Sequence, residues 1–450
     1  MRRQVEQAPS GGTLRLAKRT TNVFRSRSAT PGLDVTGLSG VLEVDPERRT
    51  ADVLGMTTYE DLVDATLPYG LMPLVVPQLK TITLGGAVTG LGIESSSFRN
   101  GLPHESVLDM DVLTGDARLL TVDPHGEHAA LFHGFPNSYG SLGYALRLRI
   151  ELEPVPPYVM LTHERHDTAA ELADRMAQVC ADRSMGGAES GTDGGPGERA
   201  DFVDGTVFAP DEQYLTVGTC VDAAPYTSDY TGQDIYYRSI QRRRRDFLTI
   251  RDYLWRWDTD WFWCSRALGV QHPLVRRLVP RRYKRSDVYM KAVAFERRHH
   301  VAARVDRWRG RPDREVVVQD VEVPIERTAQ FLDFFHREVG IEPVWLCPLR
   351  QRDPGTTWDL YAFDPRQTYV NLGFWSSVEL GPGQRDGDHN RRIEEVVAQL
   401  GGRKSLYSTA YYDRDTFWAT YNGATYSTLK KTYDPDGRFA DLYDKTVRQT

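Results

Sequence analysis

The chain has 450 residues, of which 40% are hydrophobic and 26% are charged, and its formal net charge is −6. This length suits two domains that share a crevice, and the composition is ordinary for a globular protein. The weak negative charge gives no general attraction to nucleic acid, and no apolar run approaches the roughly 18 residues that a membrane-spanning helix needs.

The N-terminal segment, residues 1–12, is polar and lacks the apolar stretch of a signal peptide. The four cysteines stand far apart and form no CxxC pair, so the sequence indicates neither a zinc site nor a disulfide framework. We therefore expect a cytoplasmic protein without a metal site, for which any contact with the inner face of the membrane is peripheral.

Short β-rich pieces alternate with Gly, Pro, Asn and Asp over the first 155 residues. Thr58 is a suitable N-cap and Gly70 a suitable stop, so they predict a helix over residues 58–69. Alternating apolar and polar residues predict strands at 41–45, 50–53, 107–113 and 144–152. Three prolines at 154, 156 and 157 then break the pattern, and we place a domain boundary after residue 155.

The rest of the chain mixes helices and strands, so the expected fold class is α+β. A strand is predicted at 316–323 and an amphipathic helix at 327–339. Polar Gly-rich residues at 184–199 and 381–392 predict loops. The expected units are residues 1–155, 156–392 and 393–450.

Residues 83–97 read TLGGAVTGLGIESSS and contain four glycines within eight positions. Glycine lets the backbone approach a bulky ligand, and the N–H groups of such a loop form a concavity for a pyrophosphate. The spacing matches neither a P-loop nor a GxGxxG fingerprint. A second glycine turn precedes the strand at 144–152. We interpret both segments as a cofactor cradle, with tight backbone packing as the alternative; the candidate contacts are Thr83, Leu84, Gly85, Gly86, Gly90, Gly92, Ile93, Glu94, Ser95, Gly140 and Gly143.

The run GGAVTGLGIESSS, the FRNGL that follows it and the later PNSYGSLGYALRLRIELEP resemble the FAD-binding domain of the vanillyl-alcohol-oxidase (PCMH) superfamily. A likeness to the Δ24-sterol reductases of that superfamily extends through VWLCPL at 344–349 and TYDP near the C-terminus. The chain is most similar to an actinobacterial branch, whose FAD-binding oxidoreductases act beside an S-adenosylmethionine-dependent methyltransferase to make 10-methyl-branched fatty acids. The resemblance implies a PCMH-type FAD-binding domain with a short N-terminal subdomain, followed by a mixed α/β substrate domain.

The resemblance also bears on how the cofactor is held. Many relatives attach the flavin to a histidine or cysteine, but the first histidine here is His104 and no cysteine precedes Cys180. FAD is therefore expected to bind non-covalently. Lys18 and Arg19 stand where relatives have a loop that holds the pyrophosphate, and both can contact phosphate.

The implied reaction is reduction of an unactivated carbon–carbon double bond, with electrons from NADPH. The methylene of a 10-methylene fatty-acyl chain and the Δ24 bond of a sterol both give a tertiary centre when protonated, so one mechanism serves both substrates. A general acid must supply that proton in a site without water. The candidate acids are Glu94, Asp258 and His104, in that order. Their structural alternatives are a cap or ribose contact, a helix-surface acid and a loop histidine.

Three further features concern ligands and partners. The resemblance implies that Lys430 or Lys431 stabilises negative charge on the flavin, although both could be solvated helix lysines. The aromatic stretch 253–263 either lines an acyl trough or is ordinary core. The basic runs 242–245 and 276–285 either face solvent or bind anionic lipid headgroups. The expected partners are thus a lipid substrate, the methyltransferase and a membrane surface, with no nucleic acid.

Other functions remain open at this point. A Δ24-sterol-reductase-like enzyme for another isoprenoid or steroid uses the same chemistry. The fold also supports an FAD-linked oxidase of an alcohol or sugar, which rapid reoxidation by O2 would reveal. A catalytically silent scaffold for the methyltransferase would lack bound FAD.

Overall fold

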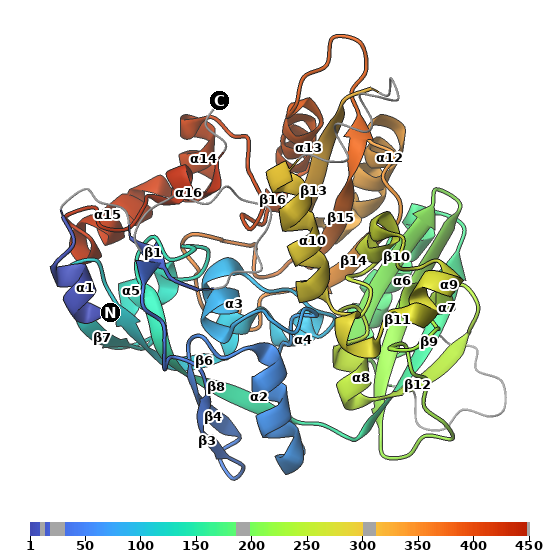
Figure 1. The fold of residues 1–450 in the computed structure, drawn as a ribbon, viewed down its shortest axis with the longest axis horizontal. Coiled ribbons are helices and arrows are strands. Elements are labelled where there is room, and N and C mark those ends of the chain that lie inside the picture. The colour runs from blue at the N-terminus through green and yellow to red at the C-terminus, as the bar shows by residue number, and fades with distance from the viewer. Residues whose placement is uncertain (10–13, 19–31, 186–198, 300–311, 448–450) are drawn as a thin grey trace.

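The computed structural model describes residues 1–9, 14–18, 32–185, 199–299 and 312–447. A six-stranded sheet and an eight-stranded sheet organise the protein, and they form the frames of two units (Figure 1). A buried apolar cluster contains side chains of both units, including Leu148 from the first and Trp345 from the second. The space between the sheets is therefore packed core. Polar groups buried in it are candidates for a functional site, because a core otherwise contains apolar side chains.

The first sheet is antiparallel, with strand order β3-β4-β8-β6-β7 and β5 paired with β8. The four predicted strands are confirmed, and the strands are β3 (Val41–Asp45), β4 (Thr50–Leu54), β5 (Leu71–Pro73), β6 (Val107–Leu113), β7 (Leu119–Val122) and β8 (Tyr144–Pro154). The predicted helix is confirmed as α2 (Tyr59–Thr66) with a short 3-10 extension, η1 (Leu67–Tyr69). Thr58 caps it by accepting from the Asp61 N–H at 3.1 Å, and Gly70 ends it with φ of 68°.

The remaining elements of this unit are short. A separate parallel pair joins β1 (Arg15–Leu16) to β2 (Gly32–Leu33). The helices are α1 (Arg2–Glu6), α3 (Leu84–Gly90), α4 (Ser97–Asn100), η2 (Pro103–Ser106) and α5 (Ala129–Gly134).

The second sheet has the strand order β12-β9-β11-β10-β14-β15-β13-β16. Its strands are β9 (Tyr158–His166), β10 (Phe202–Ala209), β11 (Glu212–Val221), β12 (Arg245–Thr249), β13 (Arg314–Pro324), β14 (Val344–Leu349), β15 (Tyr369–Glu379) and β16 (Arg403–Lys404). The predicted strand at 316–323 lies within β13, and the predicted helix at 327–339 is η5 (Ile325–Arg327) continued by α12 (Thr328–Glu338).

One face of this sheet is covered by helices, and the other faces the first unit. Apolar residues of α6 (Ala169–Asp182), α12 and α13 (Asp388–Gln399) form a core cluster with alternate residues of the strands, such as Val317 and Val321 on β13. The residues between them, including Asp320 and Glu322, project to the opposite face. The second unit also contains α7 (Tyr236–Ile240), α8 (Ile250–Leu254), η3 (Cys264–Leu268), α9 (Pro273–Leu278), η4 (Arg281–Tyr283) and α10 (Ser286–His299).

The unit boundaries differ in part from the prediction. The chain leaves the first sheet with β8 and enters the second with β9, so the break lies at residues 155–157. The predicted boundary at residue 393 is wrong, because it falls inside α13, and α13 and β16 both pack on the second sheet. The predicted loop at 381–392 ends where α13 begins, and most of the loop at 184–199 lies outside the described residues.

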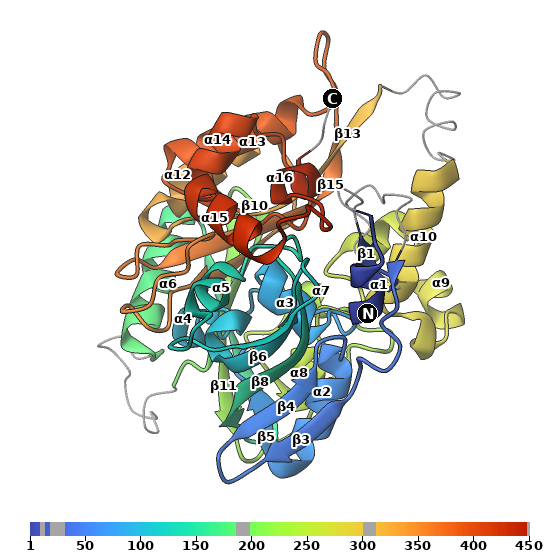
Figure 2. The same cartoon turned by 90° about the vertical axis from the view of Figure 1, so that its left-hand side faces the viewer.

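The C-terminal segment returns to the first unit. Its helices are α14 (Arg414–Thr420), α15 (Gly423–Tyr433) and α16 (Leu442–Thr446), and they lie above α3 and α5 in Figure 2. Leu14 forms a parallel bridge with Phe439. The Gly115 N–H donates to the Tyr433 carbonyl at 2.8 Å, and Arg438 donates to the Gly115 carbonyl at 2.9 Å. The first unit is therefore built from both ends of the described chain.

Candidate active site

The glycine segment forms the short helix α3, and the prediction of a loop there is wrong. Thr83 caps the helix, and its hydroxyl accepts from the Gly86 N–H at 3.3 Å. The Leu84 N–H donates to the Thr57 carbonyl at 2.9 Å, and the Gly85 N–H donates to the Gly55 carbonyl at 3.0 Å. The amides of Leu84, Gly85 and Gly86 thus have protein partners, and they do not form the predicted anion concavity.

The glycines of α3 allow close packing instead. A Cβ atom on Gly85 would lie 2.8 Å from the Gly55 carbonyl oxygen, and one on Gly92 would lie 2.8 Å from the ring of Pro77. Both distances are shorter than any normal contact, so a larger side chain at Gly85 or Gly92 would displace α3 or the segment that follows it. The packing interpretation, which the sequence left open, therefore explains these two positions.

The second glycine turn lies against the C-terminal end of α3. The Tyr139 N–H donates to the Thr89 carbonyl at 3.1 Å, and the Tyr139 hydroxyl donates to the Gly90 carbonyl at 2.9 Å. Gly140 has a φ of 73°, a conformation that favours glycine. The two segments that the sequence singled out are thus in direct contact.

Several buried polar atoms around α3 have no partner among the described residues. They are Gln78 Nε2 and Thr81 Oγ1 before the helix, and Asn137 Oδ1 and Ser138 Oγ in the second turn. Lys18 Nζ lies 3.9 Å from the position of a Cβ on Gly86, and burial lowers the pKa of its ammonium. No hydrogen-bond or ion-pair partner of Lys18 is found in the described part of the chain. This region therefore offers a cation and unpaired polar groups to a ligand.

The other predicted cofactor contacts are placed differently. Lys430 donates to the carbonyls of Ser141 and Phe439, both at 2.8 Å, and to Asp434 at 2.6 Å. An ammonium has three donors, so Lys430 has none left for a cofactor, and that assignment is corrected to a structural role. Lys431 is exposed on α15, which fits the solvated alternative. Arg19 lies outside the described residues.

Glu94, directly after α3, belongs to a fully buried charged cluster. Its Oε1 accepts from the Ser95 hydroxyl at 2.7 Å and from Arg256 Nη2 at 3.1 Å. The same Arg256 nitrogen lies 2.7 Å from Asp204 Oδ2 on β10. Tyr253 stacks on the guanidinium, whose centre lies 4.0 Å from the ring centroid. We call Glu94, Asp204 and Arg256 the arginine cluster.

The arginine cluster contains two acids and one cation. Burial raises the pKa of the Glu94 carboxyl, although Arg256 and Ser95 oppose the shift. The raised pKa favours the protonated form of Glu94, and one proton on the cluster would balance its charges. Glu94 Oε2 and Asp204 Oδ1 are buried and have no partner among the described residues. A protonated carboxyl with one unengaged oxygen is suited to donate a proton to a bound molecule.

Polar residues also line the inward face of the second sheet. Asp204 lies opposite Thr216, and Thr216 lies opposite His163. Thr216 Oγ1 and His163 Nδ1 are 2.8 Å apart, and burial lowers the pKa of His163 to about 4. Farther across the sheet, Asn371 lies opposite Glu322. Charged and polar groups therefore cross the sheet on the face turned to the first unit.

Asp320 and Glu322 on β13 form a second buried group on this face, which we call the carboxyl pair. Tyr361 donates to Glu322 Oε2, and Ser405 donates to Glu322 Oε1 at 2.8 Å. Burial raises the pKa of Asp320 to about 7 and that of Glu322 to about 8. Neither acid has an ion pair with a lysine or arginine in the described part of the chain. Burial without a compensating cation therefore favours the neutral form of both carboxyls, which titrate near neutral pH.

The two lower-ranked acid candidates lie elsewhere. Asp258 is buried rather than on a helix surface, and its Oδ1 accepts from the Lys80 N–H at 3.1 Å and from Ser286 at 2.6 Å. It thereby joins the start of α10 to the segment before α3. His104 is packed edge-on against Trp358 at 4.4 Å, and burial lowers its pKa to about 3. Burial favours the neutral imidazole, whose N–H is a far weaker acid than an imidazolium, so His104 is a poor candidate for the general acid.

The aromatic stretch, which includes Arg256, is buried against the second sheet. Trp255, Trp257, Phe262 and Trp263 are each at most 5% exposed. The Phe262 ring lies 4.4 Å from that of Trp375 on β15. These rings exclude water from the sheet face on which the polar residues lie.

Comparison with known proteins bears on what this site holds. Residues 14–123 match the family model described as FAD binding domain, of the FAD_binding_4 family. This match covers Lys18, α3 and Glu94, and it agrees with the α+β fold of a PCMH-type domain.

Relatives extend over nearly the whole chain. The Delta(24)-sterol reductase homolog of Caenorhabditis elegans is 25% identical in an alignment of 437 residues that covers 91% of this chain and 78% of the relative. The Delta(24)-sterol reductases of Arabidopsis thaliana and Homo sapiens are 25% and 23% identical, over 95% and 91% of this chain and 78% and 77% of theirs. Cytokinin dehydrogenase 5 of Arabidopsis thaliana is 34% identical over 28% of this chain and 23% of its own length.

The residues around α3 fit FAD. The Lys18 ammonium suits a pyrophosphate, and the unpaired polar atoms of Gln78, Thr81, Asn137 and Ser138 suit the ribose and ring edges of a dinucleotide. These atoms lie on both sides of α3, within or directly after the matched domain. The amides at the start of α3 take no part in this fit.

Sequence reasoning found Glu94 but missed its partners. Asp204 and Arg256 come from separate segments, and neither stands in a recognisable motif. For Asp320 and Glu322 a signal exists, because acids alternate with valines in VVVQDVEVP and so mark one face of a strand. Acidic residues at alternate positions of an otherwise apolar strand are the pattern that would have indicated Asp320 and Glu322.

Proposed function

We propose that this protein is an FAD-dependent oxidoreductase that reduces an unactivated carbon–carbon double bond. The observation that carries the proposal is the arginine cluster, in which Glu94 is buried, has a raised pKa and lies within the segment that matches the FAD-binding family model. The relatives that are similar along the chain are named as Delta(24)-sterol reductases, which agrees with this class of reaction. Bound FAD supplies hydride-transfer chemistry.

A proton donor is the part of this reaction that the chain itself must provide. An isolated alkene has no carbonyl to take up charge, so its terminal carbon must be protonated as cationic character develops at the substituted carbon. In that step the Glu94 O–H bond breaks and a C–H bond forms. The carboxylate that results gains the full attraction of Arg256, 3.1 Å away. Tyr253 and the buried tryptophans keep water from competing for the proton.

For the substrate we propose a 10-methylene fatty-acyl chain carried on a phospholipid, with NADPH as the electron donor. Addition of a proton and a hydride equivalent gives the 10-methyl chain and NADP⁺. A methyltransferase that makes the methylene group would be the functional partner. The buried aromatic stretch suits an acyl chain, and it equally suits the side chain of a sterol or another isoprenoid, which is the alternative substrate class.

The proposal is tested with purified protein, detergent-dispersed 10-methylene phospholipid and NADPH under anaerobic conditions. We expect NADPH oxidation that depends on the lipid, together with conversion of the 10-methylene to the 10-methyl chain by mass spectrometry. Conversion of a Δ24-sterol but not the lipid would support the alternative substrate. Absence of FAD in the heat-released supernatant, or O2-dependent oxidation of an alcohol without alkene reduction, would refute the proposal.

A further inference from the structure

The segment that follows the aromatic stretch is strongly basic. Residues 261–286 include seven lysines and arginines and no aspartate or glutamate. The structure divides these cations into two groups. Arg276 is buried, forms an ion pair with Asp260 at 2.7 Å and donates to the Gly232 and Asp234 carbonyls, both at 2.9 Å. It anchors α9, so the solvated-face interpretation does not apply to it.

Three arginines of the same segment remain exposed. Arg266, Arg277 and Arg282 have no acidic partner among the described residues. Arg282 lies 4.9 Å from the centroid of the exposed Tyr283 ring. Their charge is therefore available to an anionic partner, and no neighbouring carboxylate neutralises it.

Large apolar side chains are exposed among these arginines. Leu274 and Leu278 are four positions apart on α9 and therefore share one face of the helix. They are 68% and 81% exposed. Leu268, Val275 and Tyr283 are exposed beside them to 40–47%. We call these five residues the α9 patch. Isolated exposed leucines are common, but five exposed large apolar side chains within 16 residues of sequence are a concentration that calls for a partner.

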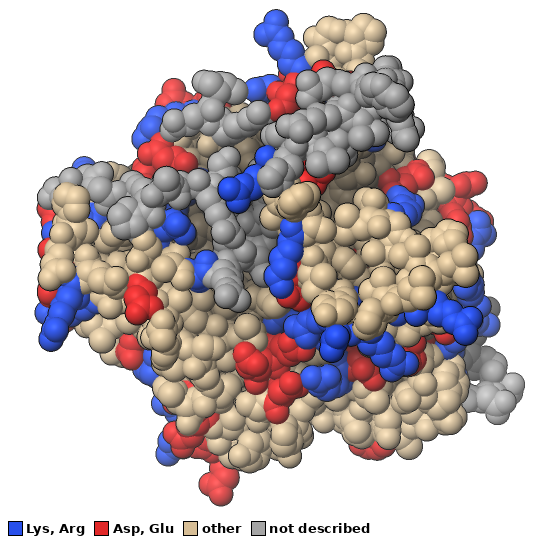
Figure 3. Space-filling view, in the orientation of Figure 1, with Lys and Arg blue, Asp and Glu red and all other residues tan. Residues whose placement is uncertain are grey.

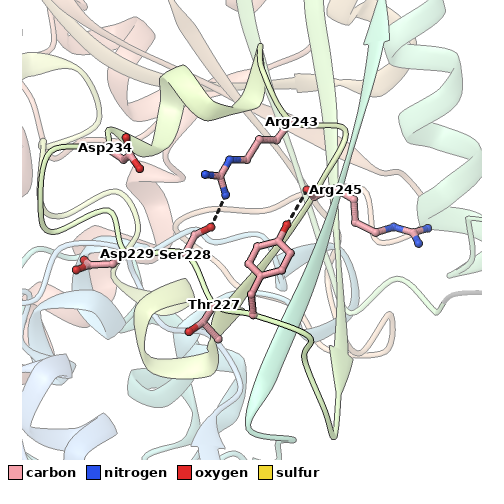
Figure 4. Close-up of a pocket in the computed structure, with 7 residues that line it drawn as sticks. Thr227, Ser228, Asp229, Asp234, Arg243 and Arg245 are labelled. Atoms are coloured by element: carbon pink, nitrogen blue, oxygen red, sulfur yellow. Dashed lines mark hydrogen bonds between the residues drawn. The ribbon is translucent and has the colours of Figure 1, made fainter.

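The surface view agrees with this arrangement. On the side of the molecule where α9 lies, Figure 3 shows a broad uncharged area with Lys and Arg at its border. A hollow of about 600 Å³ adjoins it, because Asp229 lines the hollow and pairs with Arg281 at 3.0 Å. Arg243 and Arg245 also line this hollow, but so do Asp229 and Asp234 (Figure 4). The hollow has no net charge, so the anion preference comes from the α9 patch and its arginines.

We propose that the α9 patch and Arg266, Arg277 and Arg282 form a docking surface for an anionic lipid bilayer. Leucines that enter the acyl boundary while arginines contact headgroup phosphates are the pairing that peripheral membrane binding requires. A second copy of the chain fits less well, because a two-fold interface would bring these unpaired guanidiniums against one another. The aromatic stretch contains both Arg256 of the arginine cluster and Asp260, which forms an ion pair with Arg276 on α9. On the proposed function, this continuity places the lipid-docking surface next to the part of the chain that would receive the acyl group.

The test is vesicle flotation of the full chain, with phosphatidylcholine vesicles that contain or lack phosphatidylglycerol. Binding is expected only with the anionic lipid, and it should weaken as salt rises. The double variant Leu274→Ser/Leu278→Ser should reduce the partition coefficient about tenfold. Arg277→Glu/Arg282→Glu should reduce it by more than about tenfold, since each arginine near the surface contributes about fivefold.

Matched controls use residues that resemble these in exposure but lie elsewhere. Leu119→Ser alters a 54% exposed leucine on β7, and Arg385→Glu reverses an exposed arginine before α13; both should bind as the original chain does. Equal binding of all variants, or no flotation with anionic vesicles, would overturn the proposal. So would a dimer in sedimentation that the leucine variant dissociates, because the patch would then be a subunit interface. Turnover of detergent-dispersed substrate is expected to be unchanged in the surface variants, so failure of docking and failure of the proposed reaction are read separately.

Discussion

The arginine cluster and the carboxyl pair both hold buried acids at the inward face of the second sheet, and they stabilise these acids in different ways. Each buries two acids, but only the first provides a cation, with Arg256 within 3.1 Å of both Glu94 and Asp204. In the carboxyl pair, Asp320 and Glu322 rely on hydroxyl donors such as Tyr361 and Ser405. At Glu94 the charge of Arg256 opposes the effect of burial on the pKa, whereas no lysine or arginine among the described residues does so at the carboxyl pair, whose pKa values lie at about 7 and 8. We propose Glu94 rather than Glu322 as the proton donor, because Arg256 stabilises the carboxylate that remains after proton transfer.

The largest expected effect tests the catalytic side of this comparison. Glu94→Gln keeps the shape of the neutral side chain but removes its acidic proton, so turnover should fall by roughly 10²- to 10⁴-fold. FAD content and the urea unfolding midpoint should stay close to those of the original chain. The control is Glu315→Gln, because Glu315 is also buried on β13 but accepts from Asn390 on the helix-covered side. Full turnover by Glu94→Gln would remove Glu94 as the acid.

Removing the shared cation is expected to lower the stability of the folded protein. Arg256→Met leaves Glu94 and Asp204 without compensation, and the free energy of unfolding should drop by about 3–5 kcal/mol. Urea denaturation measures it. The double variant Arg256→Met/Asp204→Asn removes the stranded charge and should recover part of the loss. If Arg256→Met unfolds at the same urea concentration as the original chain, the arginine is not what supports the two acids.

The carboxyl pair predicts an effect of pH with a definite sign. In the unfolded chain these acids titrate near pH 4, but in the folded protein their pKa values are about 7 and 8. Between these limits the folded state binds more protons than the unfolded state, so the free energy of unfolding should fall as pH rises from 5 to 8. Their stabilising contribution is complete below pH 4. Glu322→Gln should flatten this slope in urea titrations at several pH values, and unchanged slopes would show that Glu322 is not held neutral.

Lys18, a partly buried cation, gives the smallest expected effect. No ion pair joins Lys18 to an acid among the described residues, so it is a cation without an acid, whereas the carboxyl pair consists of acids without a cation. If a phosphate of FAD is its partner, Lys18→Ala should weaken FAD binding by about tenfold, the worth of one charge-assisted hydrogen bond. Flavin fluorescence titration of the FAD-depleted protein measures the affinity. Lys431→Ala, which alters an exposed lysine on α15, is the control, and equal affinities in both variants would refute the contact.

Local patterns predicted much of the frame. The hairpin of β3 and β4, helix α2 and strand β6 followed from alternation and from the cap and stop at Thr58 and Gly70. Helix α3 did not, because its three glycines oppose a helix in isolation. The hydrogen bond from Gly85 to the Gly55 carbonyl and the cap by Thr83 outweigh that preference, and only the folded chain reveals them.

The site was predictable only where a single segment carried it. Glu94 stood inside the glycine motif, so its position could be inferred. Its meaning depends on Asp204 and Arg256, which come from β10 and from the aromatic stretch more than fifty residues apart in sequence. Lys430 was misassigned for the same reason, since its three acceptors lie in the second glycine turn and at the end of the chain. Long-range pairing of charges leaves no periodic signal in a sequence.

The return of the C-terminal helices has a consequence for how the protein is made. Lys430 and Lys445 donate to the carbonyls of Ser141 and Tyr139, and Leu14 pairs with Phe439, so the first unit closes only with residues that follow about 300 positions later in the chain. These contacts do not yet exist when residues 1–155 leave the ribosome. The second glycine turn is therefore unsecured until residues 430–445 have been synthesised, and we expect FAD to bind only after that point.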